Sequence, residues 1–288
     1  MSTRLQIISH LCRVDLPDTP VAFNHVLTLA VGKALGKSAI DAENFAAANT
    51  RRYWADILEL VQEDKRSGLI PFCDIVDRDA LLLRNPSAGL IEGACHKLHR
   101  TGILLRARPT MLGAIDGLTD RAYEALGCLV TRLIGAGRAQ LTPKGNEGGI
   151  DFLATMHFYS KCHVFSGFGK EVRIVGQSKK YTTKVQVDAV DQFIKTIENV
   201  RHRSDRVDGV IPAWFHASSG PIVGWMVAHS GFQRGAQNEA KKHGIVLSDS
   251  RDLAETVALS RRFHPTIPAT QRGTCLAADL TALLNEFA

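Results

Sequence analysis

The residues with the clearest chemistry are an acid after a glycine-rich turn and a polar-basic pair further along the chain. Asp151 ends the turn 145–151, and Gln177 and Lys179 lie in the β-patterned run 172–181. Because one residue separates Gln177 from Lys179, both side chains point to the same face of a strand. An acid that faces an amide oxygen and a lysine on the next strand can hold a divalent metal against a phosphodiester. Alone, the pattern also fits an ordinary strand with solvated polar residues.

Each of these residue types suits one part of phosphodiester hydrolysis. Mg²⁺, or Mn²⁺ in its place, prefers oxygen ligands, takes few of them from protein and keeps several waters. The carboxylate of Asp151 and the amide oxygen of Gln177 are such ligands. Lys179 could orient the attacking water or offset the charge that develops on phosphorus. The glycines before Asp151 allow a tight turn and a close approach of nucleic acid.

The chain around these residues predicts alternating helices and strands that would position them. Apolar residues recur at helical spacing in 119–137 and in 185–200. A buried strand is predicted at 223–228, and Ser230 is expected to cap the helix that follows it. A short strand at 245–247 precedes a further helix. This order predicts an α/β core with a mixed central sheet flanked by helices.

These landmarks resemble the catalytic domain of Mrr-type restriction endonucleases, a branch of the PD-(D/E)xK nuclease superfamily. The resemblance covers residues 119–259, about half of the chain. The shared features, in chain order, are a helix carrying Glu124, the glycine-rich turn ending at Asp151, the strand 177–181, the strand-to-helix segment 227–232 and the closing strand 245–249.

The resemblance implies a restriction-endonuclease-like core and assigns a role to each matching residue. Asp151 would be the principal metal ligand, and Lys179 the catalytic lysine. Gln177 would occupy a position that is acidic in most of the superfamily and Gln in the Mrr branch. Glu124 would match an acid that holds a metal-bound water or a second metal, and Glu147 stands where the family often has Asp.

The charge balance favours a polyanionic partner. The 288 residues carry a net charge of +6, with a pI near 9.1, and are 45% hydrophobic, which suffices for a proper core. Lysines and arginines crowd the segment 161–206, where Lys180 and Lys184 are candidate DNA contacts, although such charges can also be merely solvated. The six cysteines form no CxxC pair, which suits a reducing cytoplasm, and no apolar run or signal pattern indicates a membrane.

The N-terminal half predicts helices at 21–35, 41–66 and 88–98, followed by a β-prone stretch at 103–109. A helix that passes into an arginine-bearing strand is typical of a winged helix. Mrr-type nucleases commonly carry such a domain. In it, the helix around Arg100 would enter the major groove, and Arg106 and Arg108 would touch phosphates. A helical bundle for dimerisation or partner contact is the alternative.

The sequence therefore predicts three parts: a helical or winged-helix-like domain at 1–112, a nuclease domain at 113–262 and a helical tail at 263–288. The expected activity is metal-dependent hydrolysis of double-stranded DNA in restriction or anti-phage defence. Alternatives are a non-catalytic DNA-binding protein on a nuclease fold and a junction- or RNA-directed nuclease. A homodimer is expected for cutting a duplex. A motor or sensor ATPase would be a separate protein, since no GxxxxGK[ST] loop occurs.

Overall fold

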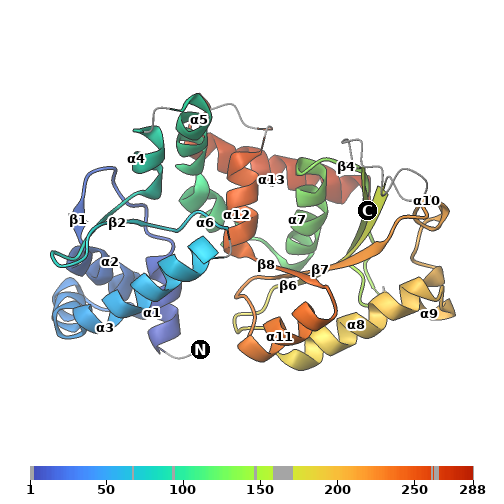
Figure 1. Ribbon diagram of the computed structural model, residues 1–288, viewed down its shortest axis with the longest axis horizontal. Coiled ribbons are helices and arrows are strands. Elements are labelled where there is room, and N and C mark those ends of the chain that lie inside the picture. Colours follow the sequence, from blue (N-terminus) through green and yellow to red (C-terminus); the bar gives the residue numbers. More distant parts are fainter. Residues whose placement is uncertain are drawn as a thin grey trace. The chain divides into compact units, whose positions relative to one another are not determined.

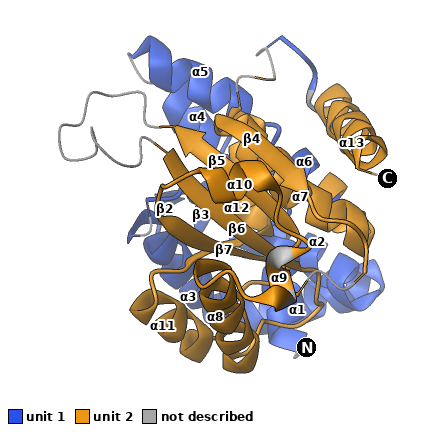
Figure 2. Cartoon of the chain, turned by 90° about the vertical axis from the view of Figure 1, so that its right-hand side faces the viewer, with its two compact units in different colours: residues 1–113, 264–269 blue, residues 114–263, 270–288 orange. Residues whose placement is uncertain are grey.

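The computed structural model divides the chain into two compact units (Figure 2). The first comprises residues 1–113 and 264–269, and the second comprises residues 114–263 and 270–288. Glu147 and the basic residues Lys161 and Lys170 lie outside the described part of the chain. No helix in that part is both long and apolar enough to span a bilayer. The described residues are 3–66, 68–92, 95–145, 148–157, 171–260, 262 and 266–287.

The first unit is mainly helical, as the sequence predicts. The helices expected at 21–35 and 41–66 are confirmed, and Gly36 ends the first of them with a φ of 61°. A small antiparallel sheet in the order β1-β3-β2 accompanies them. The elements are α1 (Thr3–Leu11), β1 (Val21–Ala22), α2 (Phe23–Leu35), α3 (Ala39–Arg66), β2 (Asp74–Asp77), β3 (Leu82–Arg84), α4 (Pro86–Ile91), α5 (His96–Leu105) and α6 (Arg108–Asp116), which continues into the second unit.

The strand expected at 103–109 is wrong, because these residues continue α5 and begin α6. Leu104 and Leu105 are buried, and a Cβ at Gly102 would lie 2.7 Å from the side chain of Ile91. Close packing of α5 against α4 therefore outweighs the local β preference. The single helix expected at 88–98 is likewise two helices. A wing carrying arginines does not form at 103–109.

The second unit contains a mixed five-stranded sheet among its described residues, in the order β4-β5-β6-β7-β8. The strands β4, β5 and β6 are antiparallel, whereas β6, β7 and β8 are parallel, which confirms the predicted mixed sheet. The strands are β4 (Ala136–Leu141), β5 (Phe152–His157), β6 (Glu171–Lys179), β7 (Ile222–Ala228) and β8 (Val246–Asp249). The helices are α7 (Asp120–Leu133), α8 (Val187–Arg201), α9 (Asp205–Asp208), α10 (Ala213–Ala217), α11 (Arg234–Lys242), α12 (Ser250–Leu259) and α13 (Ala269–Glu286).

Helices cover both faces of this sheet, with α7 and α12 on one side and α8 and α11 on the other (Figure 1). Leu153 and Val175 share a buried cluster with Phe193 of α8. Phe152 points to the opposite face, where it meets Gly127 of α7. Adjacent residues of β5 thus anchor the two helical layers, as the alternation of a strand requires.

The packing of Phe152 predicts a large effect for a single added methyl group. A Cβ at Gly176 would lie 2.0 Å from Cζ of Phe152, whose ring already packs at 5.6 Å against that of Trp225. We expect Gly176→Ala to lower the free energy of unfolding by about 1–3 kcal/mol, measured by urea denaturation. The matched control is Gly113→Ala in α6, where nothing lies within 4 Å of the added Cβ. It should raise stability by about 0.5–1 kcal/mol, and equal midpoints for both variants would contradict the packing argument.

Strand β4, at the edge of the sheet, is linked to the end of the chain through Arg132. Arg132 Nη2 donates to the carbonyl of Ala139 at 3.1 Å. The same guanidinium binds the carboxylate of Glu286 through two contacts of 2.8 Å and lies 5.6 Å from the ring centroid of Phe287. One carbonyl of the edge strand is therefore already bonded to a side chain and is not free to pair with a further strand.

Candidate active site

Asp151 lies just before β5 and is fixed to both neighbouring strands. Its carbonyl accepts hydrogen bonds from the backbone N–H and the hydroxyl of Thr142, both at 2.9 Å. Its N–H donates to the carbonyl of Gly176 at 2.9 Å, and its Oδ2 accepts from the N–H of Ser178 at 2.5 Å. The carboxylate of Asp151 is thus held beside the segment of β6 that carries Gln177.

Gln177 is only 7% exposed, and its orientation follows from one hydrogen bond. Its Nε2 donates to the carbonyl of Gly149 at 2.8 Å, so its Oε1 points away from that carbonyl. A carboxylate at this position would place two acceptor oxygens against each other. The local backbone therefore favours glutamine over an acidic residue at this position.

The glycine-rich turn before Asp151 is fixed from two elements. Gly148 and Gly149 have φ values of 60° and 83°, a conformation that glycine adopts at little cost. Thr196 of α8 donates from its hydroxyl to the carbonyl of Gly148 at 3.0 Å. A Cβ at Gly149 would lie 3.1 Å from Gln177 Nε2 and 3.2 Å from Thr196 Oγ1. The turn therefore needs glycine for both its backbone and its close packing.

Lys179 is the last residue of β6, opposite Ala228 of β7. Its Nζ lies 6.0 Å from the ring centroid of Tyr181, within the range of a cation–π contact. No described carboxylate forms an ion pair with it, so its positive charge is not neutralised within that part of the chain. With Gln177 on the same face, the ammonium group is available to a phosphate or a water.

The loop after β7 holds the backbone around Lys179. The N–H of His229 donates to the carbonyl of Lys179 at 2.9 Å, and Ser230 Oγ donates to the carbonyl of Tyr181 at 2.7 Å. The ring of His229 is in turn held by Asp116, whose Oδ1 lies 2.8 Å from Nε2. The predicted capping role of Ser230 is wrong, because α11 begins after Gln233.

Glu124 lies in the first turns of α7, whose N-cap is Thr119. Arg121 connects it to the Asp151 turn, since its Nη1 donates to Glu124 Oε2 at 2.7 Å and its Nη2 to the carbonyl of Thr142 at 2.6 Å. Thr142 also bonds the carbonyl of Asp151. Glu124 and Asp151 therefore belong to one hydrogen-bonded network. The residues that join them, Arg121 and Thr142, were not identified from the sequence.

The oxygen donors of Asp151, Glu124 and Gln177 suit a hard cation such as Mg²⁺. Within the described residues, no group of three or more His, Cys, Asp or Glu side chains could hold a metal. A site at this position would therefore combine two carboxylates with one amide oxygen and complete its coordination with water or phosphate oxygens. Such an all-oxygen donor set is typical of Mg²⁺, whereas zinc sites usually contain nitrogen and sulfur ligands.

The parallel strand next to β7, β8, ends in a half-buried acidic capping box. Asp249 caps α12, and its N–H donates to Asp252 Oδ2 at 2.7 Å. Burial, followed by the charge of Asp249, raises the pKa of Asp252 to about 7. Burial also raises the pKa of Tyr123, whose hydroxyl lies 3.2 Å from Ser250 Oγ and whose ring packs edge-on against His229. This cluster supports the loop that holds Lys179.

The predicted DNA contacts differ in how far their charges are already bound. Lys184 is exposed and Lys180 half-buried in the connection that follows Lys179. Arg173, part of the basic segment, instead donates from Nε to the carbonyl of Gly220 at 2.8 Å and stacks on the ring of Phe215, and burial lowers its pKa. Arg173 therefore stabilises the fold, and the basic segment is not uniformly available to phosphate.

The three arginines predicted for the first unit also differ. Arg100 is exposed on α5. Arg106 is paired with Asp18, and Arg108 donates to the carbonyls of Ile70 and Pro71 at 2.6 and 2.8 Å. Of the three, Arg100 is the one whose side chain has no described partner.

Comparison with known families agrees with this geometry. Residues 115–257 match the family model Mrr_cat, described as a restriction endonuclease. No curated protein matches the sequence. The match spans the sheet and every residue of the candidate site.

Solved structures similar to the chain include three restriction endonucleases. "DNA modification-dependent restriction endonuclease AspBHI" shares 18% identity over 62% of this chain and 40% of its own, with a TM-score of 0.40. "MspJI Restriction Endonuclease in Complex with 27-mer Oligonucleotide" shares 20% identity over 74% of this chain and 47% of its own, with a TM-score of 0.39. The restriction endonuclease FokI shares 11% identity over 89% of this chain and 44% of its own, with a TM-score of 0.37. The chain thus spans less than half the length of each.

Proposed function

We propose that this chain, whose residues 115–257 belong to the Mrr-type restriction endonuclease family, hydrolyses DNA phosphodiester bonds with the help of Mg²⁺. One observation carries the proposal. The carboxylate of Asp151, the oriented amide of Gln177 and the un-neutralised ammonium of Lys179 occupy adjoining ends of two paired strands. This is the residue set that metal-dependent phosphodiester hydrolysis requires.

Asp151 and Gln177, with Glu124, would hold the metal, which supplies Lewis-acid stabilisation of the charge on the phosphodiester. Lys179 would orient the attacking water and offset negative charge on the phosphoryl oxygens. Ser178 contributes through its backbone N–H, which fixes the Asp151 carboxylate at 2.5 Å. The side chains would thus be positioned before the substrate arrives.

The wider role follows the family and the charges. Lys180 and Lys184 would bind backbone phosphates next to the cleaved bond, and Arg100 would contribute from the first unit, so binding should weaken steeply with salt. Arg106 and Arg108 would contact phosphate only by exchanging their present partners. The proposed substrate is double-stranded DNA, cut by a homodimer. The proposed role is restriction or anti-phage defence in the cytoplasm, with any sensor or ATPase supplied by a separate protein.

Plasmid cleavage tests this function. The purified chain should nick or linearise a supercoiled plasmid in Mg²⁺ or Mn²⁺, and EDTA should stop the reaction. Equal cleavage of RNA or of branched junctions would favour a nuclease of different specificity. DNA binding without cleavage in any metal, unchanged by the loss of Lys179, would instead favour a non-catalytic DNA-binding protein.

The contact between Asp116 and His229 predicts a graded effect on cleavage. We expect His229→Ala and Asp116→Ala each to slow single-turnover cleavage by about tenfold, about 1.4 kcal/mol. Either change removes the ring contact that fixes the loop after β7, and the N–H of residue 229 in that loop then holds the Lys179 carbonyl less firmly. Since the two residues act as a pair, the double variant should be no slower than either single variant.

Asp116→Asn is the matched control, because it keeps an acceptor oxygen for His229 and should restore most of the rate. DNA affinity measured in EDTA should not change in any of these variants. Additive losses, or equal losses in affinity and rate, would contradict a positioning role for the pair.

A further inference from the structure

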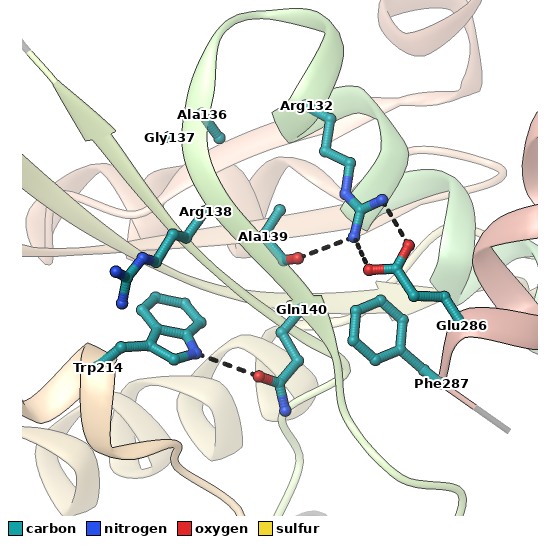
Figure 3. Close-up of a pocket in the computed structure, with 9 residues that line it drawn as sticks. All are labelled: Arg132, Ala136, Gly137, Arg138, Ala139, Gln140, Trp214, Glu286 and Phe287. Atoms are coloured by element: carbon teal, nitrogen blue, oxygen red, sulfur yellow. Dashed lines mark hydrogen bonds and ion pairs between the residues drawn. The ribbon is translucent and has the colours of Figure 1, made fainter.

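A pocket of about 540 Å³ lies along the uncovered side of β4 (Figure 3). It is formed by residues 136–140 of β4, by Trp214 of α10 and by Glu286 and Phe287 at the end of the chain. None of the residues assigned above to metal binding or catalysis lines it. Its side chains therefore have no role in the proposed cleavage chemistry.

Several polar groups of the pocket are already bonded, which defines what remains for a ligand. Glu286 is bound to Arg132, so its charge is neutralised. Trp214 Nε1 donates to Gln140 Oε1 at 3.2 Å, which turns the amide nitrogen of Gln140 away from the indole. Arg138 is exposed and has no hydrogen-bond or ion-pair partner among the described residues. The uncommitted groups are thus donors: one guanidinium and one amide.

The aromatic groups of the pocket add a second preference. The indole of Trp214 is held in place by Gln140 and by an edge contact with Phe215 at 5.7 Å. Arg138 and Trp214 lie next to each other across the mouth of the pocket (Figure 3). A fixed ring beside an unpaired cation suits a ligand that joins a planar base to a phosphate.

The strand register places two residues of this pocket, Arg138 and Gln140, on the same face of the sheet as the candidate site. Gln140 pairs with Leu153, and Leu153 pairs with Val175, so these side chains share a face with Gln177. Arg138 precedes Thr142, which bonds Asp151, by four residues, or about 13 Å of strand. That length corresponds to a few nucleotides at about 3.4 Å each.

We infer that the pocket binds a nucleotide of the DNA strand that flanks the cleaved phosphodiester, with its base unpaired and stacked on Trp214 and its phosphate on Arg138. The inference rests on the proposed nuclease function and assigns the pocket to the same substrate. Gln140 would donate to the phosphate or to the edge of the base.

Tryptophan fluorescence in EDTA tests the pocket without cleavage. The chain has three tryptophans, of which Trp54 and Trp225 are only 6% and 8% exposed, so a ligand in the pocket should act on Trp214. A short single-stranded oligonucleotide should quench this emission in a saturable way. Trp214→Phe should remove the signal yet keep most of the affinity, measured by anisotropy of a labelled oligonucleotide, because phenylalanine retains a stacking ring.

Arg138→Gln should weaken oligonucleotide binding by about tenfold, whereas Lys241→Gln should leave it within about twofold, since Lys241 is an exposed cation on α11, outside the pocket. If the two variants bind the oligonucleotide equally well while the wild-type protein cleaves plasmid, the nucleotide site in the pocket is overturned and the nuclease proposal stands. Quenching by deoxyadenosine monophosphate but not by the oligonucleotide would overturn its assignment to a DNA strand. Oligonucleotide binding in the pocket without plasmid cleavage would overturn the nuclease proposal alone.

Discussion

Replacing Asp151 with asparagine should reduce DNA cleavage by about a thousandfold or more, a loss of about 4 kcal/mol in transition-state stabilisation. Asparagine keeps an oxygen that can accept from the N–H of Ser178, so the strand ends should stay paired. The variant loses the negative charge that a divalent cation requires at this position. The expected result is therefore a folded, DNA-binding and inactive protein.

Lys179→Met should produce a loss of similar size for a different reason. Methionine retains an unbranched apolar stem but has no positive charge to place beside the phosphoryl oxygens. Single-turnover cleavage in Mg²⁺ would be measured beside DNA affinity in EDTA. The charge-matched controls are Asp188→Asn and Lys241→Met, since both side chains are exposed on helices of the same unit. Wild-type rates in either site variant would exclude the assigned site.

The residues proposed for catalysis could be singled out in the sequence because their pattern is local. Asp151 follows two glycines, and Gln177 and Lys179 occupy alternate positions of one strand. The residues that position them carry no such signal. Asp116 and His229 are 113 residues apart, and their contact forms only when β7 pairs with β6. A histidine after a strand has many uses, so its partner could not be identified without the fold.

The errors in the predicted fold have a similar origin. Strand β4 was not predicted because its residues are mostly polar or small, and a partly exposed edge strand lacks the apolar alternation of an inner one. The run at 103–109 has the opposite problem. Its apolar residues suit a strand locally, but Gly102 allows α5 to pack closely on α4, and that contact decides the structure.

The net charge of the chain does not indicate which individual cations are available for binding. The basic segment beyond Asp151 includes Lys184, which is exposed, and Arg173, which is bonded to Gly220 and stacked on Phe215. Both count equally in the net charge. Only the folded structure shows which cation is already used, and this distinction leads to Arg138 rather than Arg173 as a nucleotide contact.

Asp252, the half-buried acid of the α12 capping box, predicts the second large effect, on stability. Because the pKa of Asp252 rises from 3.8 to about 7 on folding, the folded chain retains a proton that the unfolded chain releases at intermediate pH. Its contribution to stability is therefore fully present below about pH 4 and is lost progressively as the pH rises from there to about 7. Above that pH the ionised side chain destabilises the fold relative to a neutral one, by an amount on the order of a few kcal/mol.

Asp252→Asn should remove this cost, because an asparagine oxygen can still accept from the N–H of Asp249 without carrying charge. We expect the variant and the wild type to have similar free energies of unfolding near pH 4. The variant should become progressively more stable toward pH 8, as measured by urea denaturation across the range. Asp188→Asn, an exposed acid in the first turn of α8, should show no such divergence. A constant difference between Asp252→Asn and wild type at every pH would contradict a raised pKa for Asp252 in the folded protein.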